Sequence, residues 1–491
     1  MTCCMNRVNI MNAGLAFLFV LLMSTTVSAA DWPTYRGDNT RSGYTATPLA
    51  RTLHLQWTHR PLHGPRPAWP APAHRDVLNQ HDKLDARNVD DHAFHPVAVG
   101  DRVLFGSSSE DRIVCLDART GEVQWVFFTS GPVRYAPAVW DERVLFGSDD
   151  GYVYCVRLDN GSLLWKHRVG PVSQHLPGNE RMISQWPVRT GVAVEDGIAY
   201  AIGGFFPSYG VYACALRIED GSVVWKEQLS GVSPQGYLLL SPQHVYSPTG
   251  RTSPFSLDRN TGKIARQYNS VGGTFALLAG DTLLTGRGND GRVEAIDTAT
   301  RDRLISFAGR HMVVTPEQSF MLSETHLQVL DRVRYLELTR QINTLQQRRR
   351  QLEDKLKKAA GDDATASEVR REIAQVSRDL DAATQARKEC MRVNVPTTHT
   401  LSLAVAGDII VCGGNGEVAL YDVSSGERLW TAPVEGKALG LAIAGSRLIV
   451  STDQGVLHCF GNAPVDQPRV VQQRPNEAPD ATDTLSDAYR E

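Results

Sequence analysis

The sequence predicts an all-β protein, an eight-bladed β-propeller, and two observations lead to this prediction. A phrase of three apolar strands separated by Gly/Asp turns occurs eight times between residues 99 and 460. Most copies run on into a fourth strand, which often carries a tryptophan. Units of four short strands with a period of about 40 residues are typical of radially repeated sheets. Seven blades are the alternative.

The eight copies differ in length but keep the same order of strand and turn. In chain order they read VGDRVLFGSSSEDRIVCLD, WDERVLFGSDDGYVYCVR, VEDGIAYAIGG, SPQHVYSPTGRTSPFSLD, AGDTLLTGRGNDGRVEAID, TPEQSFMLSETHLQVLD, AGDIIVCGGNGEVALYD and AGSRLIVSTDQGVLHCF. The last copy ends at Phe460 without a tryptophan strand, whereas a strand near residues 53–58 (HLQW) has none before it. We expect this N-terminal strand to complete the last blade and join the two ends of the chain.

A fixed spacing marks the turn between the third and fourth strands. Asp117, Gly121 and Trp125 lie four residues apart, and the spacing returns before Trp165, Trp225 and Trp430. The Asp side chain can cap the turn, and the glycine supplies the positive φ that a short hairpin needs. We expect each tryptophan to pack between neighbouring units, where it buries a large apolar surface.

These phrases resemble a known family. LDARTGEVQW and YDVSSGERLW are similar to the pyrroloquinoline-quinone-like (PQQ-like) repeat of quinoprotein alcohol dehydrogenases and of the outer-membrane assembly propeller BamB. The opening DWPTYRGDNTRSGYT resembles the leader of exported propellers from planctomycete-type bacteria. The resemblance covers residues 31–461 apart from one insertion. It implies the propeller fold and says little about activity, since propellers host many functions.

The insertion, residues 332–392, changes the period of the apolar residues. Leu338, Ile342 and Leu345 follow steps of four and three, and a similar stripe begins at Val369 after a Gly-Asp-Asp turn. This pattern predicts an antiparallel coiled-coil hairpin inserted in the sixth blade. The segment has 15 Lys and Arg against 10 Asp and Glu. It is interpreted as a docking arm for an envelope partner, and a solvated spacer is the alternative.

The two ends of the chain are predicted to lie outside the propeller. Residues 1–30 have a short apolar run followed by Val27-Ser28-Ala29-Ala30, as a secretory signal peptide does. An uncleaved anchor is the alternative. The mature protein is expected to be periplasmic or secreted, with no transmembrane segment after cleavage. Residues 462–491 are rich in Pro, Gln and Asp and are predicted to be a disordered tail.

The cysteines, the histidines and the net charge indicate which kinds of bond, metal site and partner to expect. Six cysteines follow the signal, most in equivalent apolar strands that the repeat holds apart, so we expect buried free thiols. Seven of the 14 histidines lie between residues 54 and 95, at spacings that match no zinc signature, so no metal site is expected. A net charge of -3 argues against nucleic acid as a partner.

Loops that interrupt the repeat provide the candidate ligand or partner site. Arginine and aromatic side chains together suit anionic, sugar or peptide ligands. The alternative is that the aromatic residues pack between blades and the arginines satisfy loop carbonyls. The candidates are Arg134, Tyr135, Arg181, Trp186, Arg189, Gln235, Tyr237 and Arg251.

The sequence therefore favours a non-catalytic binding or scaffold protein of the cell envelope, and no catalytic residue is assigned. The alternative is a PQQ-dependent alcohol or sugar dehydrogenase, which the resemblance implies would need PQQ, calcium and a pair of adjacent cysteines. The one adjacent pair, Cys3-Cys4, lies in the predicted signal, and no CxxCH haem motif is present. No cofactor is expected outside this alternative.

Overall fold

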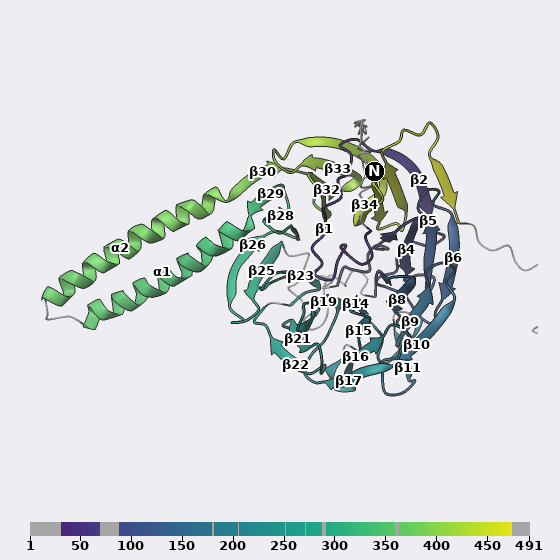
Figure 1. The fold of residues 1–491 in the computed structure, drawn as a ribbon, viewed down its shortest axis with the longest axis horizontal. Helices are drawn as coiled ribbons and strands as arrows, with labels where there is room; N and C mark the ends of the chain where they lie inside the picture. Colours follow the sequence, from purple (N-terminus) through teal and green to yellow (C-terminus); the bar gives the residue numbers. More distant parts are fainter. Residues whose placement is uncertain are drawn as a thin grey trace, which may run out of the picture.

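Sheets arranged in a ring make up most of the molecule (Figure 1). The computed structural model describes residues 31–68, 88–178, 181–204, 206–250, 252–270, 272–286, 291–358 and 363–473. The predicted signal peptide, residues 1–30, lies outside the described residues. None of the described helices is long and apolar enough to cross a membrane.

Six sheets of the described chain have four antiparallel strands each, in sequence order. They are β3–β6 (Val97–Val99, Arg102–Ser107, Arg112–Asp117, Val123–Phe128), β7–β10 (Ala138–Trp140, Arg143–Gly147, Tyr152–Arg157, Leu163–Arg168), β14–β17 (Ala193–Glu195, Ile198–Gly203, Val211–Arg217, Val223–Leu229), β19–β22 (Leu239–Leu240, His244–Ser247, Phe255–Asp258, Ile264–Gln267), β23–β26 (Phe275–Ala279, Thr282–Gly286, Arg292–Asp297, Arg303–Ala308) and β27–β30 (His311–Val314, Gln318–Leu322, His326–Asp331, Met391–Pro396).

A nine-stranded sheet joins the two ends of the chain. Its order is β1 (Tyr44–Thr45), β31 (Ser402–Ala406), β32 (Ile409–Gly413), β33 (Asn415–Asp422), β34 (Arg428–Ala444), β35 (Arg447–Thr452), β36 (Leu457–Gly461), β2 (His54–Arg60) and β37 (Arg469–Gln472). The long β34 pairs with β33 through its first part and with β35 through its second. The N-terminal β2 pairs antiparallel with β36, so that Trp57 lies opposite Cys459.

Short elements complete the ring. A hairpin of β11 (His175–Gly178) and β12 (Arg181–Ser184) extends one loop, and a 3-10 turn spans Pro207–Tyr209. The strands β13 (Thr190–Gly191) and β18 (Gly236–Tyr237) pair in parallel.

The tryptophans of the repeat pack between neighbouring sheets, as predicted. A methyl group on Gly161 would lie 2.4 Å from the ring of Trp125, and the same close approach joins Trp57 to Gly121. Trp125 also donates from Nε1 to the carbonyl of Leu158, 3.0 Å away in the next sheet. Glycine is therefore required at this position for two reasons: its φ is positive, and the tryptophan ring leaves no room for a side chain.

Arginine replaces tryptophan at one of these contacts. Trp225 donates from Nε1 to the carbonyl of Arg259 at 2.9 Å. In the next sheet Arg266 stands at the tryptophan position, and its guanidinium donates to the carbonyl of Thr298, the equivalent residue one sheet further on. The apolar area is smaller there, but the hydrogen bond between sheets is kept.

The N-terminal strap, residues 32–45, runs through the centre of the ring, where the purple trace lies in Figure 1. It hydrogen-bonds the innermost strand of seven successive four-strand groups. The bonds join Trp32 N to Ala98 O (2.7 Å), Val139 N to Pro33 O (2.8 Å), Asn39 Nδ2 to Val194 O (2.7 Å), Leu240 N to Asn39 O (3.0 Å), Leu278 N to Thr40 O (2.8 Å), Val314 N to Ser42 O (3.1 Å) and Val405 N to Gly43 O (2.9 Å). The strap therefore ties the ring together from inside.

The helical arm consists of α1 (Arg332–Lys358) and α2 (Asp363–Glu389), which lie between β29 and β30 in the chain. The two helices lie side by side and project away from the ring (Figure 1). Leu352 of α1 and Val369 of α2 are among the residues buried between them. At the base, the ring of Tyr335 contacts that of Phe307 in a tilted arrangement, with centroids 5.7 Å apart. The arm is thus anchored only where it leaves the sheets.

The predicted disordered tail, residues 462–491, is wrong for its first part. Residues 469–472 form β37, which pairs in parallel with β2, and Arg469 makes an ion pair with Glu122. The physical reason is that β2 closes its sheet as an outer strand with a free edge, which offers backbone groups to an added strand. Residues 474–491 lie outside the described residues.

Candidate functional site

A cavity of about 290 Å³ lies at the centre of the ring, beside the strap. Trp32 and Arg36 of the strap line it, together with the loop that carries Asp90 and His95. His311 and other residues near the beginning of inner strands complete the wall. Convergence of inner strands on one axis makes such a cavity the natural ligand site of a ring of sheets.

Burial shifts the pKa values of three titratable groups of this cavity toward their uncharged forms. It raises the pKa of Asp90 to about 7 and lowers the pKa of His95 to about 4. Burial likewise lowers the pKa of His311 to about 3. Arg36 donates from Nε to the carbonyl of Arg41 at 2.9 Å and lies over the ring of Phe275.

Several buried polar atoms of the wall have no hydrogen-bond partner among the described residues, and Nε1 of Trp32 and Oδ2 of Asp90 are two of them. Such atoms cost free energy unless water or a ligand satisfies them. The cavity wall is therefore suited to a small polar occupant rather than to an apolar one.

Two of the predicted site residues, Tyr135 and Tyr237, form an aromatic cluster against the strap. Tyr237 stacks on Tyr35 with centroids 3.6 Å apart, and Tyr135 meets it edge-on at 5.0 Å. The hydroxyl of Tyr237 accepts from the backbone of Ala136 at 2.8 Å, and that of Tyr135 accepts from Asn88 at 2.9 Å. Both rings are buried and hold the strap in place.

Arg134 and Arg189 converge on one buried carboxylate, Asp149. Arg134 donates from Nε to Asp149 at 2.7 Å and from Nη1 to Asp91 at 3.1 Å. Arg189 donates to both oxygens of Asp149, at 3.0 and 2.9 Å. Although burial acts to raise it, the pKa of Asp149 is held below its usual range by Arg189 and Arg134. Both guanidinium groups are thus bound to carboxylates of this chain.

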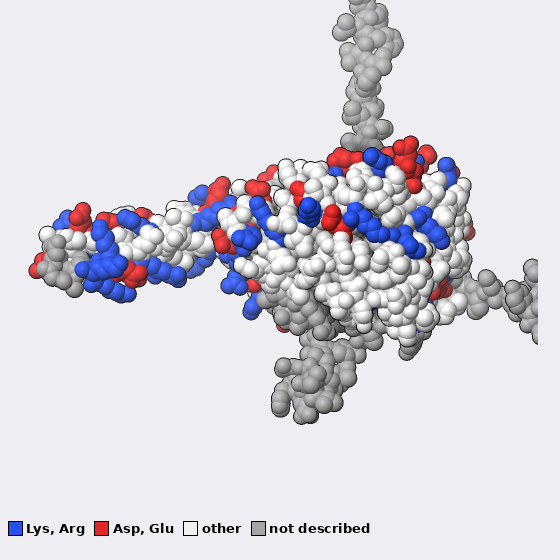
Figure 2. Space-filling view, turned by 90° about the horizontal axis from the view of Figure 1, so that it is seen from below, with Lys and Arg blue, Asp and Glu red and all other residues white. Residues whose placement is uncertain are grey.

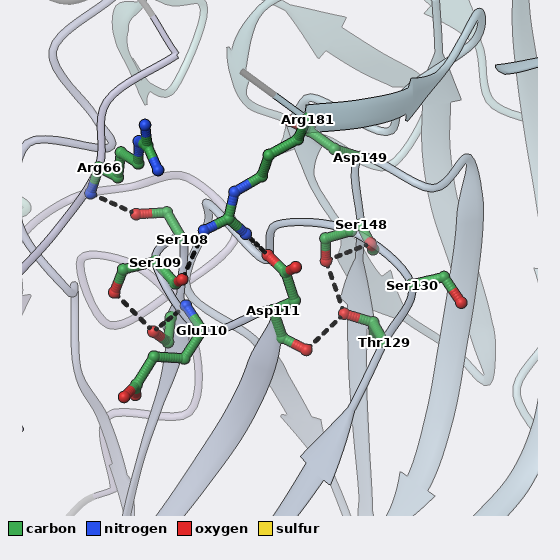
Figure 3. A network of polar contacts seen from close by, with 12 residues as sticks. Arg66, Ser108, Ser109, Glu110, Asp111, Thr129, Ser130, Ser148, Asp149 and Arg181 are labelled. Atoms are coloured by element: carbon green, nitrogen blue, oxygen red, sulfur yellow. Dashed lines mark hydrogen bonds and ion pairs between the residues drawn. The ribbon is translucent and has the colours of Figure 1, made fainter. Parts of the chain in front are cut away.

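Arg181 belongs to a separate, partly exposed network (Figure 3). From the β11–β12 hairpin it reaches Asp111 as an ion pair and donates to the carbonyl of Ser109 at 2.6 Å. The same loops hold Ser108, whose hydroxyl accepts from the backbone of Arg66 at 2.9 Å. Arg181 therefore fastens the hairpin to the neighbouring sheet.

Of the three remaining candidates, two are buried within the fold and one lies outside the described residues. Trp186 is buried and donates from Nε1 to the carbonyl of Tyr209 at 2.9 Å. The side chain of Gln235 is buried against Gly250. Arg251 lies outside the described residues.

Most of the predicted loop residues thus pack against, or form ion pairs with, other residues of this chain. The structure does not bring them into one exposed patch. Sequence reasoning missed Asp149 and Asp91, the carboxylates that bind Arg134 and Arg189. The only sequence signals were two acidic pairs, Asp149-Asp150 and Asp90-Asp91, and neither pair shows which arginines it meets.

The structure shows the surroundings of the cysteines and of one histidine, His59. The six cysteines of the described chain are all free and buried, as predicted. Burial raises the pKa of the Cys214 thiol to about 12, so it stays protonated. His59 bonds the carbonyl of Gly121 through Nδ1 at 2.9 Å, and His74 and His81 lie outside the described residues.

A calcium-supported quinone, which the alternative function requires, does not fit the described residues. Trp32 offers a ring at the central cavity, but the described residues that line it include only two carboxyl groups, those of Asp90 and Asp453. The neighbouring carboxylate, Asp91, is bound to Arg134. Within the described ranges, no group of three or more His, Cys, Asp or Glu side chains is placed to hold a metal ion.

Known proteins resemble this chain over part of its length. It is 25% identical over 140 residues to the outer membrane protein assembly factor BamB of Yersinia pestis, which covers 28% of this chain and 33% of that protein. It is 26% identical over 179 residues to a putative dehydrogenase XoxF of Paracoccus denitrificans, which covers 33% and 28%. The chain thus spans about a third of the length of these curated relatives.

Solved structures share the fold alone. The quinohemoprotein alcohol dehydrogenase from Comamonas testosteroni superposes with a TM-score of 0.57 at 12% identity, over 89% of this chain and 82% of that one. The computationally designed Ika8 protein gives a TM-score of 0.52 at 13% identity, over 75% and 96%. Identities this low carry no activity from those proteins to this one.

The repeat itself decides the family. The family model described as outer membrane protein assembly factor BamB matches residues 66–306 and 372–463, which is more than half of the chain. The unmatched stretch between them contains α1 and the first part of α2. The repeated sheets, the tryptophan-glycine contacts and this match agree: the chain belongs to the BamB family of PQQ-like repeat propellers.

Proposed function

We propose that this chain is an exported, non-catalytic propeller that binds or scaffolds other components of the cell envelope, in the periplasm or outside the cell. Membership of the BamB family supports the envelope setting. The observation that carries the binding role is the helical arm, an elongated protrusion that packs on the sheets only at its base. A protrusion of this kind adds little to the stability of the ring.

The proposal includes eight blades and a coiled-coil arm in the sixth. Six separate four-stranded sheets and the two four-strand groups of the nine-stranded sheet support eight rather than seven. The order β27, β28, β29, helices, β30 supports insertion between the third and fourth strands of the sixth blade. Buried Leu, Ile and Val side chains on the two adjacent helices support coiled-coil packing.

The second candidate function is a PQQ-dependent dehydrogenase. The shared fold with a quinohemoprotein dehydrogenase and the partial match to the putative dehydrogenase favour it. The internally paired arginines and the poor fit of the cavity for calcium favour the binding function instead.

A titration separates the two functions. The full mature protein is mixed with PQQ and Ca²⁺, and quinone absorbance and dye reduction are followed with alcohols and aldoses. We expect neither saturable binding nor turnover. Saturable binding with turnover would overturn the non-catalytic proposal.

Cross-linking in intact cells tests the role of the arm. The variant replaces residues 333–391 by a short turn, and the matched control keeps the arm but neutralises Arg119, Arg217 and Arg428, exposed on the ring. We expect the cross-linked species to be lost with the arm and kept in the control. The same pattern of species with and without the arm would contradict the proposal.

A further inference from the structure

The basic charge of the arm is confined to one helix. Over its 27 residues α1 has nine Lys and Arg against three Asp and Glu, whereas α2 has five against six. Six of the nine cations stand in the outer part of α1. They are Arg348, Arg349, Arg350, Lys355, Lys357 and Lys358.

Most of these cations are exposed and only some have an acidic partner. Arg350, Lys355 and Lys358 are exposed and face solvent. The other three have an acidic partner at the surface: Arg348 with Glu372 at 2.9 Å, Arg349 with Glu353 at 3.5 Å and Lys357 with Asp354 at 3.2 Å. Exposed pairs of this kind are weak and screened by salt, so they leave most of the positive potential in place. Figure 2 shows blue side chains gathered on the outer part of the arm.

These charges surround the outer end of α1 and do not form a stripe. With a turn of about 3.6 residues, Arg348 and Lys355 lie on one side of the seam with α2, and Arg350 and Lys357 on the other. Lys358 lies between them, on the outward face. No large apolar side chain is exposed in this part of α1. Contact with a partner would therefore rest on charge and needs no shaped pocket.

Geometry decides which anionic partner fits. A helix of 27 residues is about 40 Å long, so the end of the arm stands clear of the ring. A flat surface can meet the end of the arm without touching the ring, and charges on all exposed sides of α1 can then reach it. A single anionic chain would need a continuous groove or stripe, which this arrangement does not provide.

We propose that the outer end of the arm binds the anionic headgroups of a phospholipid membrane. The inference rests on the proposed envelope function and names the surface that its arm meets. Each Lys or Arg near such a surface contributes a modest and additive attraction, so several are needed together. The ring would be held about one arm length from the membrane.

Vesicle co-sedimentation of the full mature protein tests this. The vesicles contain phosphatidylcholine with or without phosphatidylglycerol, and the variant combines Lys355→Gln, Lys357→Gln and Lys358→Gln. The matched control combines Arg119→Gln, Arg217→Gln and Arg428→Gln on the ring, which removes the same charge. We expect binding only to the anionic vesicles, about 100-fold weaker for the arm variant and nearly unchanged for the control.

Salt and a soluble polyanion complete the test. Binding should fall steeply as salt is added, because surface charges are screened. Polyphosphate bound more tightly than the vesicles would overturn the proposal in favour of a soluble anionic polymer. No vesicle binding, or equal loss in both variants, would also overturn it. A cross-linked partner that depends on the arm would still support the proposed function in that case.

Discussion

The strap and the helical arm are both additions to the same ring of sheets, and they are held in opposite ways. The strap lies in the centre, bonded to seven inner strands. The arm lies at the periphery and touches the ring through a few residues near Tyr335. A segment in the centre contributes to the stability of every sheet it touches, whereas a segment at the edge can change without cost to the ring.

Arg41 is an example of how closely the strap is bonded to the residues around it. Its side chain is fully buried and donates to the carbonyls of Leu238, Tyr35 and Asp38 and to the hydroxyl of Thr34, at 2.7 to 3.1 Å. These four acceptors offset the cost of burying the charge at Nε and Nη1, whereas Nη2 has no partner among the described residues.

The largest expected effect comes from Arg41→Ala. Removing the guanidinium leaves several buried carbonyls without a donor, so the free energy of unfolding should fall by about 3 kcal/mol. Urea unfolding followed by tryptophan fluorescence measures it. Arg378→Ala, on the exposed face of α2, is the control and should stay within about 0.5 kcal/mol. If both variants lowered the free energy of unfolding equally, the central strap would contribute no more to stability than the arm does.

A pH effect should follow for Asp90, beside the strap. Its pKa is raised by burial to about 7 in the folded protein, against about 4 when unfolded. Ionised Asp90 therefore destabilises the fold, and this cost develops as the pH rises from about 4 to about 7. Asp90→Asn should match the parent near pH 4 and be more stable near pH 8.

Urea midpoints at several pH values measure this difference. His95 and His311 also titrate in the cavity but are present in both proteins, so the difference isolates Asp90. If the urea midpoints of the parent and of Asp90→Asn differed by the same amount at every pH, Asp90 would not be buried as it is in the structure.

The smallest effect on the ring is expected from Leu352→Ala, in the outer part of the arm. Leu352 is 2% exposed, so the arm should lose about 2 kcal/mol locally. All nine tryptophans lie outside residues 332–392, so fluorescence reports the ring while the helical circular dichroism reports the arm. For Leu352→Ala we expect the helical circular dichroism to be lost at a lower temperature than in the parent. The midpoint of the fluorescence transition should be the same in both proteins.

Leu338→Ala, the same change at the base of the arm, is the matched variant. Leu338 packs with Leu330 of β29, so both signals should shift. If Leu352→Ala also moved the fluorescence midpoint, the arm would be coupled to the ring along its whole length.

The repeat was the part of the fold that the sequence predicted best. The Asp-Gly-Trp spacing correctly predicted tryptophans packed between sheets, because a hairpin turn and its glycine are local features. The substitution of Arg266 at that position was visible, but its hydrogen bond to Thr298 was not. The loop candidates were less informative, since Arg134 and Arg189 in a sequence do not reveal whether Asp149 is near them.

The sequence by itself determined the elements and their order: short strands, tight turns, and two helices with an apolar stripe. These follow from propensity and periodicity over a few residues. Only the tertiary structure decided where the strap lies, that β37 adds to β2, and which carboxylates meet the arginines. Those outcomes depend on residues from different sheets and loops, many of them far apart in the sequence, which meet only when the ring forms, and no local pattern encodes such contacts.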